Sequence, residues 1–184
     1  MFAVCGRADN VRRVGMTTAE QIIEIFKMKP LPVEGGFYAE TYHSKEKIPP
    51  SLLPAGQSGE RSVATAILYL LTPDTYSALH RVKSDEIFHF YLGEPVTMLQ
   101  LRPDGEARTI TIGSDVLSGQ LPQVVVPKNT WQGCFLNEGG RFALMGTTVV
   151  PGFELDDFDL PDTEQLLRQY PGQRELIMRL ARED

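Results

Sequence analysis

Residues 79–93 read LHRVKSDEIFHFYLG, and the polar run at 83–85 separates two segments in which apolar and polar side chains alternate. This alternation is typical of β-strands that bury one face, and the polar run predicts a tight turn between them. The stretch also carries four groups that can exchange protons or bind metals. These are His80, Asp85, Glu86 and His89.

The period of two predicts which of these side chains share a face. Glu86 and Phe88 lie on one face of the second strand, and His89 lies on the other. If the two strands form a hairpin that folds inward, His80 and Glu86 meet in the interior. His89 then points away from them.

The sequence on both sides continues the β pattern. From Gly36 to about Val150, short β-branched or aromatic runs alternate with turn residues such as RPDG and NEGG. Seven or more such runs without a helical period predict an all-β sandwich or barrel. Thr17 and Glu20 have capping-box spacing and predict a helix that ends near Lys29. Two short helices are expected after Asp162.

Length and composition indicate one domain over residues 17–184, preceded by a flexible extension at 1–16. The formal net charge of −6 argues against nucleic acid as a partner. No apolar run is long enough for a membrane span, and two cysteines without a CxxC pair predict no disulfide framework. A cytoplasmic protein without nucleic-acid or membrane partners is expected.

Spacing around this stretch resembles the cupin superfamily, whose first motif is G-x5-H-x-H-x3-E-x6-G. His80, Glu86 and Gly93 match that motif, and Pro127 matches the second motif. The resemblance implies a double-stranded β-helix, or jelly-roll, built from two sheets.

Four ordered stretches narrow the resemblance to the Cupin-5 (DUF985) branch over roughly residues 31–160. Members of that branch are similar in fold to dTDP-keto-sugar epimerases and germin-like proteins and tend to be homodimers. The resemblance therefore implies a homodimer, and a small-molecule ligand is expected in the barrel. The stretches are PVEGGFYAETYHS, SALHRVKSDEIFHFYLGEP, VVVPKNTWQG and FALMGTTVVPGFELDDFDL.

The metal ligands of cupins are only half present. Val82 stands where metal-binding cupins have their second histidine, and Gln132 stands where they have the third. His80, Glu86 and Gln132 remain as a weak ligand set, because transition metals prefer more imidazole and carboxylate groups. No cofactor is firmly implied, and a divalent metal at low occupancy is the alternative.

The expected catalytic pair is therefore His80 and Glu86, since a carboxylate beside an imidazole can act as an acid or a base near neutral pH. Aromatic and polar neighbours are expected to line a ligand pocket inside the barrel. The expected ligand-binding residues are Tyr38, Glu40, Phe88, His89, Trp131 and Gln132.

Three functions stay open at this point. The first is a sugar-type isomerase or epimerase without a strong metal site, in which His80 is the base and Glu86 tunes it. The second is a metal-dependent lyase or dioxygenase. The third is a non-catalytic module that holds a metabolite.

Overall fold

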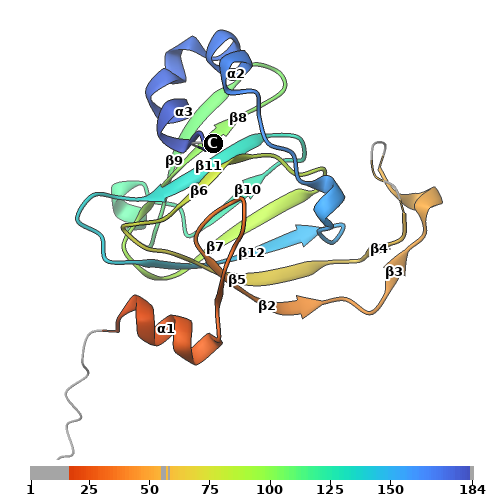
Figure 1. Cartoon of the computed structure of the whole chain (residues 1–184), viewed down its shortest axis with the longest axis horizontal. Helices are drawn as coiled ribbons and strands as arrows, with labels where there is room; N and C mark the ends of the chain where they lie inside the picture. Colours follow the sequence, from red (N-terminus) through yellow and green to blue (C-terminus); the bar gives the residue numbers. More distant parts are fainter. Residues whose placement is uncertain (1–16, 55–56, 58, 183–184) are drawn as a thin grey trace, which may run out of the picture.

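Two antiparallel sheets face one another across an apolar core in the computed structural model of the chain, which describes residues 17–54, 57 and 59–182 (Figure 1). The larger sheet has six strands in the order β1-β2-β5-β12-β7-β10, and the smaller has four in the order β6-β11-β8-β9. The all-β prediction is confirmed. The extension expected at 1–16 lies outside the described residues.

The strands of the six-stranded sheet are β1 (Lys29–Pro30), β2 (Phe37–His43), β5 (Thr65–Leu71), β12 (Ala143–Val150), β7 (Asp85–Gly93) and β10 (Gln123–Val126). Those of the four-stranded sheet are β6 (Tyr76–His80), β11 (Trp131–Leu136), β8 (Val96–Leu101) and β9 (Ala107–Ile112). A separate ribbon pairs β3 (Lys47–Ile48) with β4 (Arg61–Ser62). Short 3-10 turns lie at Pro50–Leu52, Val116–Ser118, Leu155–Asp157 and Pro171–Gln173.

The core between the sheets follows from the period of two along each strand. Tyr69, Phe88 and Met145 point inward from the six-stranded sheet, and Met98 and Cys134 point inward from the four-stranded sheet. All five are at most 1% exposed, so apolar side chains fill the interior of the barrel.

The prediction of a hairpin within residues 79–93 is wrong. Strand β6 belongs to the four-stranded sheet and β7 to the six-stranded sheet, so residues 81–84 carry the chain from one sheet to the other. Alternation gives the face of each residue but not the partner of each strand, because pairing depends on contacts between distant segments.

Helix α1 (Ala19–Phe26) covers the outer face of the six-stranded sheet. Thr18 caps it and forms a capping box with Gln21, so the cap lies one residue after the predicted Thr17. The helix also ends before Lys29, because the residue after Phe26 adopts a left-handed conformation with φ 51°.

Helices α2 (Thr163–Gln169) and α3 (Arg174–Leu180) lie together on the opposite side of the molecule (Figure 1). Their apolar faces cover Leu79, Leu99 and Leu101 on the outer face of the four-stranded sheet. The two expected C-terminal helices and the Asp162 cap are confirmed. Within the described ranges, no helix has the length and apolar character needed to cross a membrane.

Candidate functional site

Three buried polar side chains meet at one end of the barrel. His80 ends β6, Gln132 lies directly opposite it on β11, and Glu86 reaches them from β7 of the other sheet. Gln132 Nε2 donates to Glu86 Oε2 at 2.5 Å and lies 3.4 Å from His80 Nε2. The structure therefore brings together three of the residues predicted from sequence, through the amide rather than through a hairpin.

Hydrogen bonds define the roles of the two imidazole nitrogens. His80 Nδ1 lies 2.8 Å from the carbonyl oxygen of Ala78, which can only accept, so Nδ1 carries the hydrogen. In the neutral ring Nε2 then holds a lone pair, which accepts the N–H of Gln132. The basic nitrogen of His80 therefore faces the other polar groups of the cluster.

Glu86 is buried, with 7% of the residue exposed. Burial raises its pKa, and the negative charge of Glu34 raises it further. His80 and hydrogen bonds from Gln132 and Thr147 act in the opposite direction without reversing the shift. Glu86 is therefore more readily protonated than an ordinary glutamate.

Replacement of Glu86 by glutamine is expected to raise the free energy of unfolding at neutral pH. When folding raises the pKa of a carboxyl group, that group stabilises the fold fully at pH values below the pKa it has in the unfolded chain, near 4.5. The contribution is lost as the pH rises through the pKa that the group has in the folded protein. The neutral amide of E86Q has no such loss. Urea unfolding from acid to neutral pH should show a gap between E86Q and wild type that widens with pH.

Glu94 provides a control of opposite sign. Burial tends to raise its pKa, but hydrogen bonds from the backbone N–H of Phe142 and from Arg141 hold that pKa below its usual value. Glu94→Gln should therefore lose stability at neutral pH. If both variants gain stability at neutral pH, or if neither does, the conclusion that the buried charge of Glu86 destabilises the fold is contradicted.

Glu34 is a fourth member of the cluster that the sequence reasoning missed. Its Oε2 lies 3.9 Å from His80 Nε2, and its Oε1 accepts a 2.9 Å hydrogen bond from Ser77. The Glu34 side chain is 17% exposed, against 3% for His80. The two glycines that follow it were a usable signal, because they allow the backbone before β2 to turn sharply inward.

The predicted ligand set of His80, Glu86 and Gln132 does not fit a divalent cation in this arrangement. Gln132 turns its amide nitrogen, which cannot bind a metal, toward His80 Nε2 and Glu86 Oε2, so it adds no ligand atom beside them. Gln132 Oε1 is buried and has no hydrogen-bond partner among the described residues. In that part of the chain, no group of three or more His, Cys, Asp or Glu side chains could hold a metal. We therefore derive no step through a metal.

Residues 154–159, which we call the strap, cross the same end of the barrel. The ring of Phe158 stacks on the His80 ring, with centroids 5.0 Å apart and an interplanar angle of 15°. Asp159 extends the edge of β6 through two backbone hydrogen bonds with Arg81, of 3.0 and 3.1 Å. The strap therefore covers the imidazole of His80 on one side.

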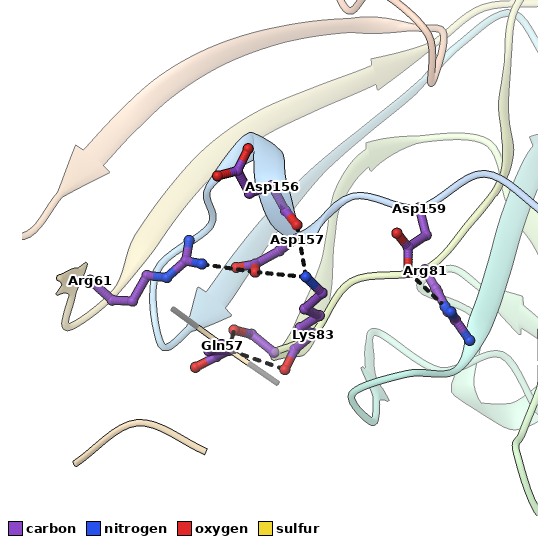
Figure 2. A network of polar contacts seen from close by, with 8 residues as sticks. Gln57, Arg61, Arg81, Lys83, Asp156, Asp157 and Asp159 are labelled. Carbon is purple, nitrogen blue, oxygen red and sulfur yellow. Dashed lines mark hydrogen bonds and ion pairs between the residues drawn. The ribbon is translucent and has the colours of Figure 1, made fainter. Parts of the chain in front are cut away.

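Charged contacts anchor the strap to the strands beneath it (Figure 2). Asp157 and Arg61 form an ion pair of 3.0 Å with side chains 1% and 3% exposed, and Lys83 lies 4.0 Å from the same carboxylate. Asp159 and Arg81 form a second pair of 3.0 Å, but these side chains are 39% and 40% exposed. The strap thus has one buried and one solvated anchor.

Two residues predicted to line a pocket lie in the filled core instead. Phe88 is 1% exposed among other apolar side chains, and Tyr38 packs against the same group. Phe88 packs beside Glu86 on the inner face of β7, whereas Tyr38 lies on β2, which β5 and β12 separate from β7.

Three other predicted pocket residues lie away from the cluster. Trp131 packs against the apolar group beneath α2 and α3, because it faces the opposite side of β11 from Gln132. His89 points from the outer face of β7 and contacts Gln123 at 3.2 Å. The Glu40 side chain is 57% exposed and lies 3.2 Å from His43, at a β-bulge in β2. None of the three reaches His80.

Comparisons with known proteins agree with this architecture. The family model described as Cupin superfamily (DUF985) matches residues 20–161. A crystal structure of a Shewanella oneidensis protein is 34% identical, covers 92% of this chain and 100% of its own, and superposes with a TM-score of 0.78. A hypothetical protein from Leishmania major is 29% identical, with 91% and 100% coverage and a TM-score of 0.81.

Two further similarities are more distant. An uncharacterised protein of Saccharomyces cerevisiae is 29% identical over 147 residues, which cover 76% of this chain and 73% of the yeast protein. A cupin 2 domain-containing protein from Halorhodospira halophila is 14% identical, with 82% and 85% coverage and a TM-score of 0.52. The second similarity concerns the fold alone and agrees with a jelly-roll.

Proposed function

Since the chain belongs to the DUF985 family of the cupin superfamily, we propose that it is a small-molecule isomerase or epimerase that works by proton transfer. The observation that carries this proposal is the Gln132 amide, which joins the basic nitrogen of His80 to the buried carboxylate of Glu86. Acid–base isomerisation needs a base that accepts a proton from carbon and a group that tunes it.

The arrangement supplies both groups. Nε2 of His80 is the proton acceptor, because Nδ1 is fixed by the Ala78 carbonyl. Burial raises the pKa of Glu86, so its carboxyl group takes up a proton more readily than an ordinary glutamate. The unpartnered Oε1 of Gln132 leaves one further hydrogen-bond acceptor in the buried cluster.

The reaction class follows from these groups. A C–H bond beside a carbonyl breaks, its proton moves to the base, and the electron pair passes to the carbonyl oxygen as an enolate. Return of a proton to the other face of the same carbon gives an epimer. Return to the former carbonyl carbon gives an isomer, provided that the hydroxyl on the first carbon passes its proton to the enolate oxygen and becomes the new carbonyl. The balance requires no oxidant or reductant.

The test is solvent-deuterium exchange, because a proton that the base holds during the enolate stage can be replaced by deuterium from the solvent. The protein is incubated in D2O with a defined panel of aldoses, ketoses and their phosphates, and NMR measures deuterium at the carbon beside the carbonyl. We expect exchange in the wild type and a loss of about 10²–10⁴-fold in His80→Ala. Glu86→Gln, which we expect to fold well, should lose exchange too.

His89→Ala is the matched control, since that histidine faces away from the cluster on the outer side of β7. It should retain wild-type exchange. Exchange that persists in His80→Ala, or a wild type that retains a sugar without any exchange, would overturn the proposal. The latter result would support a non-catalytic binding module.

A further inference from the structure

We propose that the substrate binds in a hollow outside the filled barrel and exchanges its proton with Glu34, and that this hollow takes small carbonyl compounds bearing a carboxylate or phosphate. This inference rests on the proposed function for its chemistry. The hollow has a volume of about 360 Å³ and is lined by residues 31–36, 74–76, Ala78 and Arg182. That size falls in the range of small-molecule sites.

Glu34 is the group through which the hollow reaches the buried cluster. It lines the hollow, and its Oε2 lies 3.9 Å from His80 Nε2. His80 and Glu86 are 2% and 7% exposed and do not line the hollow. A molecule in the hollow can therefore contact Glu34 but not His80 or Glu86, and Glu34 is its link to the imidazole.

The loop that carries Glu34 is held in a strained conformation. Val33 has φ 71°, a conformation that β-branched residues adopt rarely and at a cost of about 1–3 kcal/mol. Two backbone hydrogen bonds of 2.8 Å hold Glu34 in place. Its N–H donates to the carbonyl oxygen of Pro32, and its carbonyl oxygen accepts from the N–H of Ala78. Strain that the surrounding structure maintains is a feature of functional sites, because it pre-organises a reacting group.

The side chain of Glu34 is fixed as well. Ser77 donates to Oε1 at 2.9 Å, which leaves Oε2 as the oxygen nearer His80. A proton taken from carbon by Oε2 has His80 Nε2 as its next acceptor. Glu34 is thus the catalytic residue that meets the substrate, and His80 accepts the proton from it.

Charge on the wall of the hollow indicates the class of ligand. Arg182 lines it and has no ion-pair or hydrogen-bond partner among the described residues. A guanidinium binds carboxylate and phosphate groups through two parallel hydrogen bonds. Asp74 lines the same hollow and can accept hydrogen bonds from hydroxyl groups. A hydroxylated carbonyl compound with an anionic group satisfies both.

Two matched probes test where and what the protein binds. D-glucuronate carries a carboxylate, and D-glucose has a similar ring without the charge. NMR of protein labelled at its methyl groups should show D-glucuronate shifting Leu31, Val33 and Ala78, with a weaker response to D-glucose. Arg182→Ala should weaken binding of D-glucuronate about tenfold. Shifts confined to Met98 and Met145 in the barrel, or no shifts, would overturn the site.

Glu34→Gln separates this inference from the proposed function. The amide keeps the shape and can still bond Ser77, so D-glucuronate should bind, while deuterium exchange of the panel substrates should fall at least a hundredfold. If exchange persists in E34Q but is lost in His80→Ala, the proposed function stands and the role of Glu34 falls. If a wild type without exchange still binds D-glucuronate in the hollow, the site stands and the proposed function falls.

Discussion

Replacement of Asp157 by alanine is expected to lower the free energy of unfolding by about 3–5 kcal/mol, because it leaves Arg61 charged and without its partner inside the protein. The two side chains are 1% and 3% exposed and 3.0 Å apart. A guanidinium cannot escape this cost by losing its proton, because it stays charged in proteins. Urea unfolding at neutral pH measures the loss.

Asp159→Ala is the matched control in the same strap. Its ion pair with Arg81 has the same length, 3.0 Å, but side chains 39% and 40% exposed. Solvated ion pairs contribute about 0–1 kcal/mol, so this variant should unfold almost like the wild type. Equal losses in the two variants would contradict the view that burial makes the Asp157 anchor important.

The reverse deletion, Arg61→Met, should cost less than Asp157→Ala. Burial raises the pKa of Asp157, although Arg61 and Lys83 lower it in the folded protein. Without Arg61 the carboxyl can become neutral by taking a proton, which the guanidinium cannot do by losing one. The double variant Arg61→Met with Asp157→Leu should recover much of the loss, because it leaves no buried charge.

The strap links this stability to the site. Phe158, the residue after Asp157, stacks on His80 at 5.0 Å. Loss of the Asp157 anchor therefore frees the ring that covers the imidazole. Asp157→Ala should change the NMR signals of His80 and leave those of His89 unchanged, since His89 lies on the outer face of β7.

Much of the fold could be predicted because it depends on local patterns. Alternation placed Glu86 and Phe88 on the inner face of β7 and His89 on the outer face, as the structure has them. The helix after Asp162 begins at its predicted cap. The Asp162 carboxylate accepts a hydrogen bond from the backbone N–H of Gln165, and a contact over three residues can be predicted from local sequence. Such features need no knowledge of distant segments.

Features that depend on pairing between distant segments could not be predicted. Trp131 follows a motif proline and precedes Gln132, yet the two face opposite sides of β11. Its position beside Gln132 in sequence implied a shared pocket, but adjacent strand residues alternate. Glu34 was missed for a similar reason, since only the folded loop brings it to Ser77 and His80.

Substitution of Gly35 by alanine is the second change from which we expect a large loss of stability. Gly35 has φ 100°, and a Cβ at this position would lie 2.2 Å from the backbone oxygen of Tyr76. The unfavourable backbone conformation costs about 1–3 kcal/mol, and the clash with a fixed strand adds about 1–3 kcal/mol. The loop must move away from β6, and Glu34 moves with it.

Gly105→Ala separates the two contributions. Gly105 has a similar φ of 91°, but no atom lies within 4 Å of the Cβ position. It should therefore lose only the conformational part, and the difference between the two variants in urea unfolding should be about 1–3 kcal/mol. Equal losses would mean that the loop yields without resistance. A loop that yields so easily would not hold Glu34 in place against His80, so this comparison also measures the rigidity on which the proposed role of Glu34 depends.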